Sequence, residues 1–80
     1  MEQKNYETIE KFLCEKFSEE LEINIDEIDV EKAFSEYGLS SIATMQISGD
    51  LEDFLGKKIN PIILFEYYTI KKLATFLSKS

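Results

Sequence analysis

A glycine and two serines, Gly38, Ser40 and Ser41, stand directly before a long amphipathic segment. Glycine adopts turn backbone freely and serine caps helices well, so this pattern delivers a serine hydroxyl to the first turn of a helix. The sequence contains no histidine, so no Ser–His pair can form and a serine hydrolase of the usual kind is disfavoured. The pattern favours Ser41 as a hydroxyl that another protein modifies.

The start of a helix suits a negatively charged modification of Ser41. Amide hydrogens of the first turn have no partner within the helix, and the helix dipole has its positive end there. We expect Gly38 to make the turn and Ser40 to cap the helix, so that Ser41 points outward. Most Gly-Leu-Ser-Ser sequences are simply helix starts, so this pattern alone does not identify a site.

Four acids, Asp26, Glu27, Asp29 and Glu31, form a second candidate site, for a metal ion or for acid–base chemistry. Their spacing lacks the pattern of a calcium-binding loop and its glycine. A solvated acidic loop explains them as well. We therefore expect neither a metal site nor catalytic residues.

Length and charge limit the classes of protein to which the chain can belong. Eighty residues predict a single domain, residues 1–80, and 31% of charged residues is ordinary for a soluble globular protein. The net charge is −7, with 15 acids and 4 lysines in residues 1–55 against 1 acid and 5 lysines in residues 56–80. This acidity disfavours nucleic acid as a partner and favours basic proteins, although acids that only maintain solubility would give the same charge.

The sequence has no feature typical of a membrane or secreted protein. No apolar run approaches the roughly 20 residues that a membrane-spanning helix needs. The first residues are polar and are followed by acids, unlike a signal peptide. The single cysteine, Cys14, can form no internal disulfide, and without a histidine to activate it we expect a half-buried structural thiol. We therefore expect a cytoplasmic protein. We also expect the protein to be a monomer.

Helical periodicity dominates the chain and predicts an all-α fold of three to four helices. Apolar residues recur at i, i+3 and i+4 spacing between residues 6 and 17, which predicts a first helix over about residues 5–20 with Asn5 as its cap. Residues 21–40 are expected to form a long loop, with a short helix near residues 30–34 as one option. Four apolar residues are expected to fix this loop to the core: Ile23, Ile25, Ile28 and Phe34.

The second helix is predicted to begin at Ser40 or Ser41 and to end near Leu55, with Gly56 as its C-terminal cap. A rotation of 100° per residue divides it into two faces. The expected core face consists of Ala43, Thr44, Ile47, Leu51, Phe54 and Leu55. The opposite face consists of Ile42, Met45, Gln46, Gly49, Glu52 and Asp53.

Two apolar side chains one turn apart, Ile42 and Met45, thus lie on the outer face, ringed by acids. This arrangement favours a surface for a partner protein, with packing beneath the long loop as the alternative. Gly49 in the middle of the helix costs about 0.5–1 kcal/mol relative to alanine. A closely approaching partner would explain that cost.

Two shorter helical segments complete the chain. Pro61 opens a short apolar turn, residues 62–65, in the first-turn position that proline tolerates. Thr69 is predicted to cap a last helix that carries one apolar stripe. The stripe consists of Ile70, Leu73, Ala74 and Leu77.

Three blocks of the sequence resemble one known family, at the spacing typical of that family. The first, Phe34-x-Glu36-Tyr37-Gly38-Leu39-x-Ser41-Ile42, resembles the Gly-x-Asp-Ser-Leu/Ile signature of acyl carrier proteins that bear phosphopantetheine. Residues 51–56 continue the resemblance, and residues 64–77 are similar to the ending of polyketide synthase carrier domains. The chain is less similar to fatty-acid carriers and to peptidyl carriers with their Gly-Gly-x-Ser core. Residues 34–38 suggest bacterial modular synthases of the trans-acyltransferase kind.

The resemblance implies an all-α, four-helix bundle of the acyl carrier protein type, with a long loop between the first two helices and a short third helix. It implies a non-catalytic carrier in polyketide and antibiotic biosynthesis, to which a phosphopantetheinyl transferase attaches phosphopantetheine from coenzyme A, at Ser41. The terminal thiol then carries acyl intermediates as thioesters between ketosynthase, acyltransferase and other synthase enzymes. The second helix is the recognition helix of the family, which implies partner contacts at Ile42, Met45 and Gln46, and more weakly at Asp50 and Asp53.

One residue departs from the family pattern. The family usually has aspartate before the modified serine, and this chain has Ser40, which still caps a helix but brings no charge. Either a transferase tolerates the change, or the domain is loaded poorly; modification of Ser40 instead of Ser41 would break the register of the family pattern. Ser40 also leaves open a second hypothesis, in which the domain is a degenerate carrier that acts, unmodified, as a helical docking module. An adduct on Ser41 would decide between the two.

Overall fold

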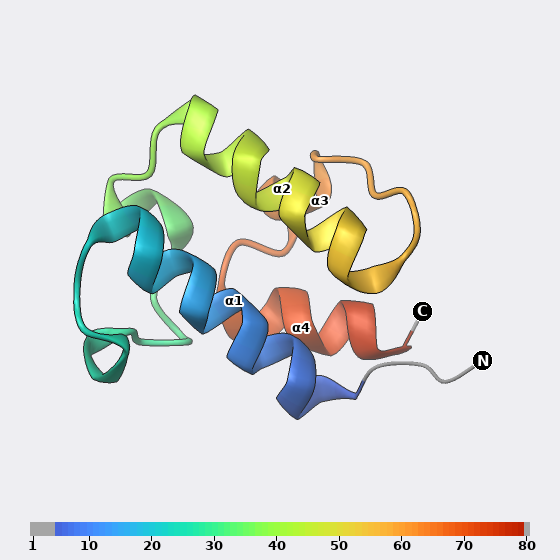
Figure 1. Ribbon diagram of the computed structural model, residues 1–80, viewed down its shortest axis with the longest axis horizontal. Helices are drawn as coiled ribbons and strands as arrows, with labels where there is room; N and C mark the ends of the chain where they lie inside the picture. Colours follow the sequence, from blue (N-terminus) through green and yellow to red (C-terminus); the bar gives the residue numbers. More distant parts are fainter. Residues whose placement is uncertain (1–4, 80) are drawn as a thin grey trace.

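Helices joined by long connections make up the part of the molecule that the structure describes (Figure 1). The computed structural model describes residues 5–79. It contains the helices α1 (Tyr6–Leu21), α2 (Ser41–Leu55), α3 (Ile63–Glu66) and α4 (Ile70–Lys79), and the 3₁₀ turns η1 (Ile25–Glu27) and η2 (Phe34–Tyr37). Within residues 5–79 there is no strand, and one isolated bridge joins Ala33 to Thr69. The all-α prediction, with a short third helix and a long first connection, is confirmed.

The N-terminal cap of α1 is the residue that the sequence predicts. The side-chain oxygen of Asn5 accepts a hydrogen bond from the Thr8 amide at 2.8 Å. The helix ends at Leu21, and its C-terminal cap is Glu22, whose backbone is left-handed (φ 56°), a conformation that costs energy in a residue other than glycine. The Ser18 hydroxyl donates to the Ile23 carbonyl at 2.6 Å, which stabilises this reversal.

The core lies mainly between α1 and α4, which pack side by side (Figure 1). α1 contributes Ile9, Leu13 and Phe17, all fully buried. The predicted apolar stripe of α4 is buried as well, so the apolar faces of the two helices pack against each other. The other buried apolar side chains of the described residues are Phe34, Ile47, Leu51, Ile59 and Leu64.

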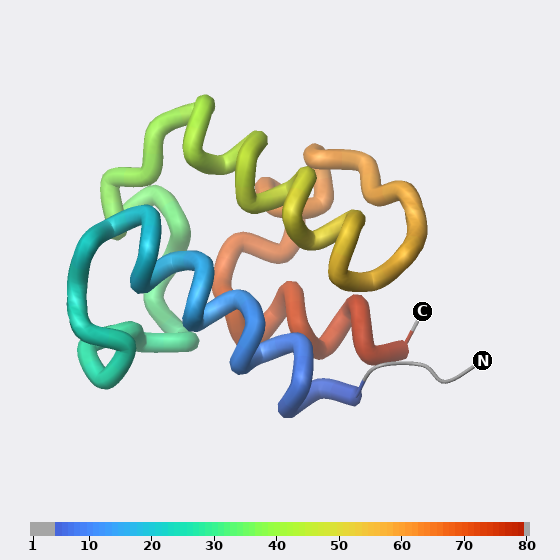
Figure 2. The backbone as a smooth tube through the Cα atoms, viewed as in Figure 1, coloured from blue at the N-terminus to red at the C-terminus, as the bar shows by residue number. Residues whose placement is uncertain are grey.

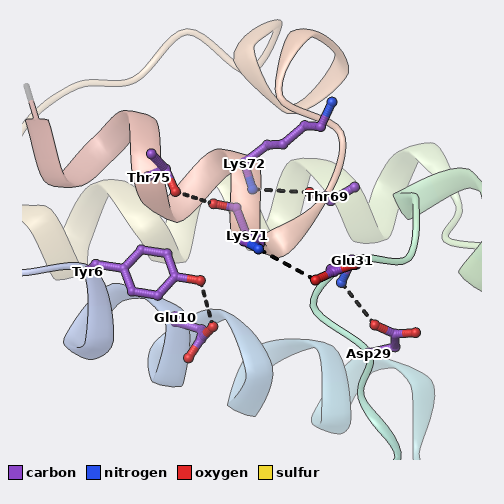
Figure 3. Close-up of polar contacts among 8 residues, drawn as sticks. All are labelled: Tyr6, Glu10, Asp29, Glu31, Thr69, Lys71, Lys72 and Thr75. Carbon is purple, nitrogen blue, oxygen red and sulfur yellow. Dashed lines mark hydrogen bonds and ion pairs between the residues drawn. The ribbon is translucent and has the colours of Figure 1, made fainter.

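Polar contacts fix the start of α4 (Figure 3). The Thr69 hydroxyl accepts from the Lys72 amide at 3.0 Å, so Thr69 caps the helix as predicted. One turn on, the Thr75 hydroxyl donates to the Lys71 carbonyl at 2.7 Å.

The long connection between α1 and α2 crosses to the start of α4 and is tied to it (Figure 2). The Phe34 amide donates to the Tyr68 carbonyl at 2.8 Å, and the Lys71 amide donates to the Val30 carbonyl at 2.9 Å. The Lys71 ammonium lies 3.4 Å from the Glu31 carboxylate (Figure 3). Two backbone hydrogen bonds therefore hold this segment against α4, and the charge pair, being exposed, adds little.

One expectation about this connection is wrong, and one option that the sequence left open is not realised. No helix forms over residues 30–34, because Ala33 is extended (φ −64°, ψ 144°) where it pairs with Thr69, and the helical turns lie on either side at η1 and η2. Ile25 does not anchor the loop, since it lies in η1 and is 41% exposed. Phe34 is buried as expected, and Ile23 and Ile28 are half-buried.

α2 has the predicted core face, with one addition. Ile47 and Leu51 are buried, and Ala43, Thr44, Phe54 and Leu55 are half-buried. Ser48, which the two-face division left unassigned, is only 3% exposed. The helix ends at Leu55 and Gly56 is its C-terminal cap, as predicted, with a positive φ of 72° that glycine adopts without strain. No helix of the described residues is long and apolar enough to cross a membrane.

Candidate functional site

Ser40 and Ser41 occupy the first two positions at the start of α2. Ser40 is the N-terminal cap: its hydroxyl accepts from the Ala43 amide at 3.1 Å, and its carbonyl accepts from the Thr44 amide at 3.0 Å. Ser41 is the first residue of the helix and is exposed to solvent. Because Ser40 makes the cap, the Ser41 hydroxyl is left available at the surface.

The segment before the serines is held by Tyr37. Its phenol oxygen donates to the Asp29 carbonyl at 2.6 Å and accepts from the Asp29 amide at 2.7 Å. The Tyr37 ring also meets the buried ring of Phe17 edge-on, with centroids 5.6 Å apart. Gly38 then reverses the chain with φ 74°, as the sequence predicts. Tyr37 is therefore held both by the long connection and by the core, and the two serines follow the turn that comes directly after it.

The electrostatics at Ser41 favour an anion. The first backbone hydrogen bond of the helix is donated by the Thr44 amide to the Ser40 carbonyl. The amides of Ser41 and Ile42 come earlier in the chain, so no carbonyl of the helix is placed to accept from them. The positive end of the helix dipole lies at the same place. No acidic residue lies in the first turn of α2. A phosphate ester on Ser41 would meet open donors and no carboxylate from the first turn of α2, so the residues present fit a phosphopantetheine group.

Beside Ser41 lies an exposed apolar surface, which we call the outer face of α2 and define as Ile42, Met45, Gln46, Gly49 and Asp53. Ile42 is 73% exposed and Met45 is 57% exposed. A shallow hollow of about 340 Å³ is lined by Ser41, Ile42, Met45 and Gln46. The alternative, in which Ile42 and Met45 pack beneath the long loop, is therefore wrong. The sequence placed both residues on the correct side of the helix.

The three acids in the second half of α2 differ in their contacts. Asp50 pairs with Lys16 of α1 at 3.6 Å. The Glu52 carboxylate accepts from the Ile59 amide at 2.8 Å and is half-buried, so its assignment to the solvent face is wrong. Asp53 is exposed and makes no ion pair within residues 5–79. Of the three, Asp53 has its carboxylate open to a partner.

A second group of exposed apolar side chains lies around α3, and the sequence analysis missed it. Ile62 is 57% exposed, Phe65 is 71% exposed and Tyr68 is 47% exposed. An apolar hollow of about 300 Å³ separates this group from the start of α2, lined by Phe34, Ser35, Leu39, Thr44, Leu64, Phe65 and Tyr68. One signal existed, since four apolar residues in succession (62–65) cannot all face inward from one helical turn.

Of the four acids of the long connection, Asp26 and Glu27 lie exposed in η1, and Asp29 and Glu31 make local contacts (Figure 3). The Asp29 carboxylate accepts from the Glu31 amide at 2.9 Å, and Glu31 in turn pairs with Lys71. Among the described residues, no group of three or more potential ligands could hold a metal ion. Cys14 is half-buried, and burial, followed by the charges of Glu10 and Glu15, raises the pKa of its thiol. A thiol held in its neutral form is a poor nucleophile.

Comparisons with known proteins agree with one another. A family model described as a phosphopantetheine attachment site matches residues 11–77. Polyketide synthase PksL of Bacillus subtilis is 38% identical over 71 residues, and a phenolphthiocerol/phthiocerol polyketide synthase of Mycobacterium tuberculosis is 34% identical over 71 residues. Each alignment covers 89% of this chain but only 2% and 4% of those proteins, so the chain spans a small part of the curated relatives that it matches.

Solved structures of carrier proteins share the fold. Asl1650 of Anabaena, an acyl carrier protein with a variant phosphopantetheinylation-site sequence, has a TM-score of 0.88 at 35% identity, over 99% of this chain and 90% of that one. A free-standing peptidyl carrier protein of Acinetobacter baumannii also has a TM-score of 0.88, at 31% identity, over 94% of each chain. The acyl carrier type of fold expected from the sequence is confirmed.

Proposed function

Because this chain belongs to the family of domains that bear a phosphopantetheine attachment site, we propose that Ser41 is the serine to which the group is joined. Family membership makes the chain a non-catalytic carrier domain with a covalent phosphopantetheine group. The observation that carries the assignment of Ser41 is its position: first residue of α2, exposed, and relieved of the capping role by Ser40. When bound, the group supplies a terminal thiol that carries acyl intermediates.

Ser41 and its neighbours have separate tasks in this proposal. Ser41 offers the hydroxyl oxygen, which forms the new phosphate ester when a phosphopantetheinyl transferase delivers the group from coenzyme A. The pyrophosphate bond of coenzyme A breaks, adenosine 3′,5′-bisphosphate leaves, and the hydroxyl proton passes to a base of the transferase. The open amides of Ser41 and Ile42 favour the phosphate charge at that position. Tyr37 and Gly38 fix the direction in which the chain enters the helix.

We further propose that the carrier serves polyketide biosynthesis. Support comes from the polyketide synthases among its relatives and from residues 34–41, which lack the Gly-Gly-x-Ser core of peptidyl carriers. Ketosynthases, acyltransferases and other synthase enzymes are the proposed partners. Ile42, Met45 and Gln46 would be their main contacts, with Asp53 next and Asp50, already paired with Lys16, contributing least.

Intact mass spectrometry tests the attachment site. The protein is incubated with coenzyme A and a broad-specificity phosphopantetheinyl transferase, and we expect a mass increase of one phosphopantetheine group. Ser41→Ala should abolish the adduct. Ser40→Ala is the matched control, because it removes the neighbouring hydroxyl and should still be loaded. An adduct that survives Ser41→Ala would reject the assignment, and a wild-type protein that remains unmodified would favour the docking module.

A further inference from the structure

The first turn of α4 contains two lysines whose charge opposes the helix dipole. Lys71 and Lys72 lie at the positive end of the helix, and no acid lies in that turn to offset them. Lys71 extends toward Glu31, with which it forms an exposed pair at 3.4 Å (Figure 3). The Lys72 ammonium lies 4.6 Å from the centre of the exposed Tyr68 ring. Exposed contacts of both kinds contribute little, so the stability of the fold does not explain the two lysines.

The outer side of α4 carries three lysines around a threonine and an aromatic ring, at helical spacing that places them on one side. We call this the basic face of α4 and define it as Lys71, Lys72, Thr75, Phe76 and Lys79. A hollow of about 800 Å³ lies on it. The apolar part of the hollow is the half-buried Phe76 ring, which stacks on Tyr67 with centroids 4.3 Å apart. The hollow therefore combines an apolar centre with cations around it.

The charges of this hollow indicate an acidic ligand. Glu31 and Glu66 also line it, but Glu31 offsets only Lys71. Lys72 and Lys79 are exposed and form no ion pair within residues 5–79. At physiological salt exposed charges act over about 8 Å, so these lysines, rather than the net charge of −7, determine what binds here. A short acidic peptide would meet the lysines alone, whereas a nucleic acid would extend to the acids of the rest of the chain.

The basic face lies away from Ser41. In Figure 1 the start of α2 is at the top of the molecule and α4 is at the bottom. The hollow beside Ser41 and the hollow on α4 share no lining residue. A partner on the basic face would therefore leave Ser41 and the outer face of α2 accessible to enzymes.

We propose that the basic face of α4 binds an acidic segment of a partner protein, separately from the enzymes that act at Ser41. Carboxylates of the segment pair with Lys72 and Lys79, and an apolar side chain between them enters the hollow against Phe76. The two lysines are separated by about 10 Å along the helix, which matches two carboxylates placed two turns apart on a helical segment. An apolar centre with a charged rim is the usual composition of a protein interface. This inference goes beyond the proposed function and does not require that Ser41 be modified.

Nuclear magnetic resonance titration of the isotope-labelled protein tests the inference. The probe is a synthetic alanine-based helical peptide of about fifteen residues, with two glutamates two turns apart and a leucine between them. We expect amide shifts confined to α4 and the residues beside its hollow, and weaker binding as salt is added. The double variant Lys72→Gln, Lys79→Gln should weaken binding about fivefold, because it removes both ion pairs. A probe with alanine in place of the leucine should bind about threefold more weakly, because less apolar surface is buried.

The double variant Lys11→Gln, Lys58→Gln is the matched control, since it removes the same charge from exposed positions outside the basic face. It should leave the dissociation constant of the peptide unchanged. Loading of Ser41, followed by intact mass, should proceed at the same rate with and without saturating peptide.

Four outcomes would overturn the inference. They are the absence of shifts on α4, equal weakening in the two double variants, slower loading in the presence of the peptide, and a single-stranded DNA oligonucleotide that shifts the same amides as strongly as the peptide. The last would assign the face to nucleic acid. Failure of the proposed function is seen elsewhere, in a wild-type protein that acquires no adduct on Ser41.

Discussion

α1 and α2 are helices of nearly equal length, 16 and 15 residues, that use their apolar side chains differently. In α1 the large residues Ile9, Leu13 and Phe17 are 0% exposed, and the remaining positions are mainly polar. In α2 apolar residues lie on two sides. Ile47 and Leu51 enter the core, while Ile42 and Met45 remain in water.

The difference separates residues that stabilise the fold from residues available for binding. Full burial of a side chain such as isoleucine or methionine contributes about 1.5–3 kcal/mol. For Ile42 and Met45 the isolated molecule does not gain this free energy, so it remains available to a protein that covers them. The same holds for Ile62, Phe65 and Tyr68 around α3, whose exposed side chains are also available for binding.

The largest expected effect is on the free energy of unfolding, and it tests whether α1, rather than the outer face of α2, stabilises the fold. Leu13→Ala should lower the free energy of unfolding by about 2–5 kcal/mol, because it leaves a cavity in the packed interface between α1 and α4. Ile42→Ala should change it by no more than about 0.5 kcal/mol, because the side chain is already in water. Urea unfolding followed by circular dichroism measures both.

The same pair of variants should show the opposite order in the loading assay. At a temperature where Leu13→Ala remains folded, its specificity constant for the transferase should match the wild type, and that of Ile42→Ala should fall. If Ile42→Ala destabilised the protein as much as Leu13→Ala, the distinction between residues that stabilise the fold and residues available for binding would be wrong.

A smaller effect is expected at the caps with which the two helices begin. Ser40→Ala removes the acceptor for the Ala43 amide and should cost about 0.5–2 kcal/mol of stability. Asn5→Ala removes the equivalent bond to Thr8 in α1 and should cost a similar amount. Thermal unfolding measures both, and only Ser40→Ala should also slow loading, because the cap that it removes positions Ser41.

Ser40→Asp sharpens this test. Aspartate keeps the acceptor and adds a negative charge at the positive end of the dipole, which should stabilise α2 by about 0.3–1 kcal/mol at low salt. The gain should diminish as salt is added. A Ser40→Asp protein with unchanged stability at low salt would show that the dipole at this end of α2 has little influence.

The elements of the fold could be predicted because they depend on local signals. Asn5, Ser40 and Thr69 are capping residues in register with apolar periodicity, and each caps the helix that it was expected to cap. Gly38 and Gly56 are placed where the backbone requires a positive φ. The exposure of Ile42 and Met45 followed from the same helical geometry, since their angular position places them opposite Ile47 and Leu51.

Long-range contacts account for what could not be predicted. Ala33 is extended because it pairs with Thr69, 36 residues away in the sequence, and no local pattern indicates this. Glu52 was assigned to the solvent face, but the amide of Ile59 binds its carboxylate after the chain has turned at Gly56. The group of Ile62, Phe65 and Tyr68 was missed because a short apolar run has no periodicity that divides its inner from its outer residues.

The last expected effect is on α1 and is confined to alkaline pH. Burial, followed by the hydrogen bond and charge of Glu10, raises the pKa of Tyr6 from 10.0 to about 12. Since the folded state holds this proton more tightly, the contribution to stability is complete below pH 10.0 and is lost as the pH rises toward about 12. Tyr6→Phe should therefore flatten the decline in the urea midpoint over this pH range, at the cost of the bond to Glu10 at lower pH. α2 contains no tyrosine, so Ile42→Ala is the control and should follow the wild-type decline. A Tyr6→Phe protein that declines as steeply as the wild type would show that the phenol of Tyr6 is not held in its neutral form by the fold.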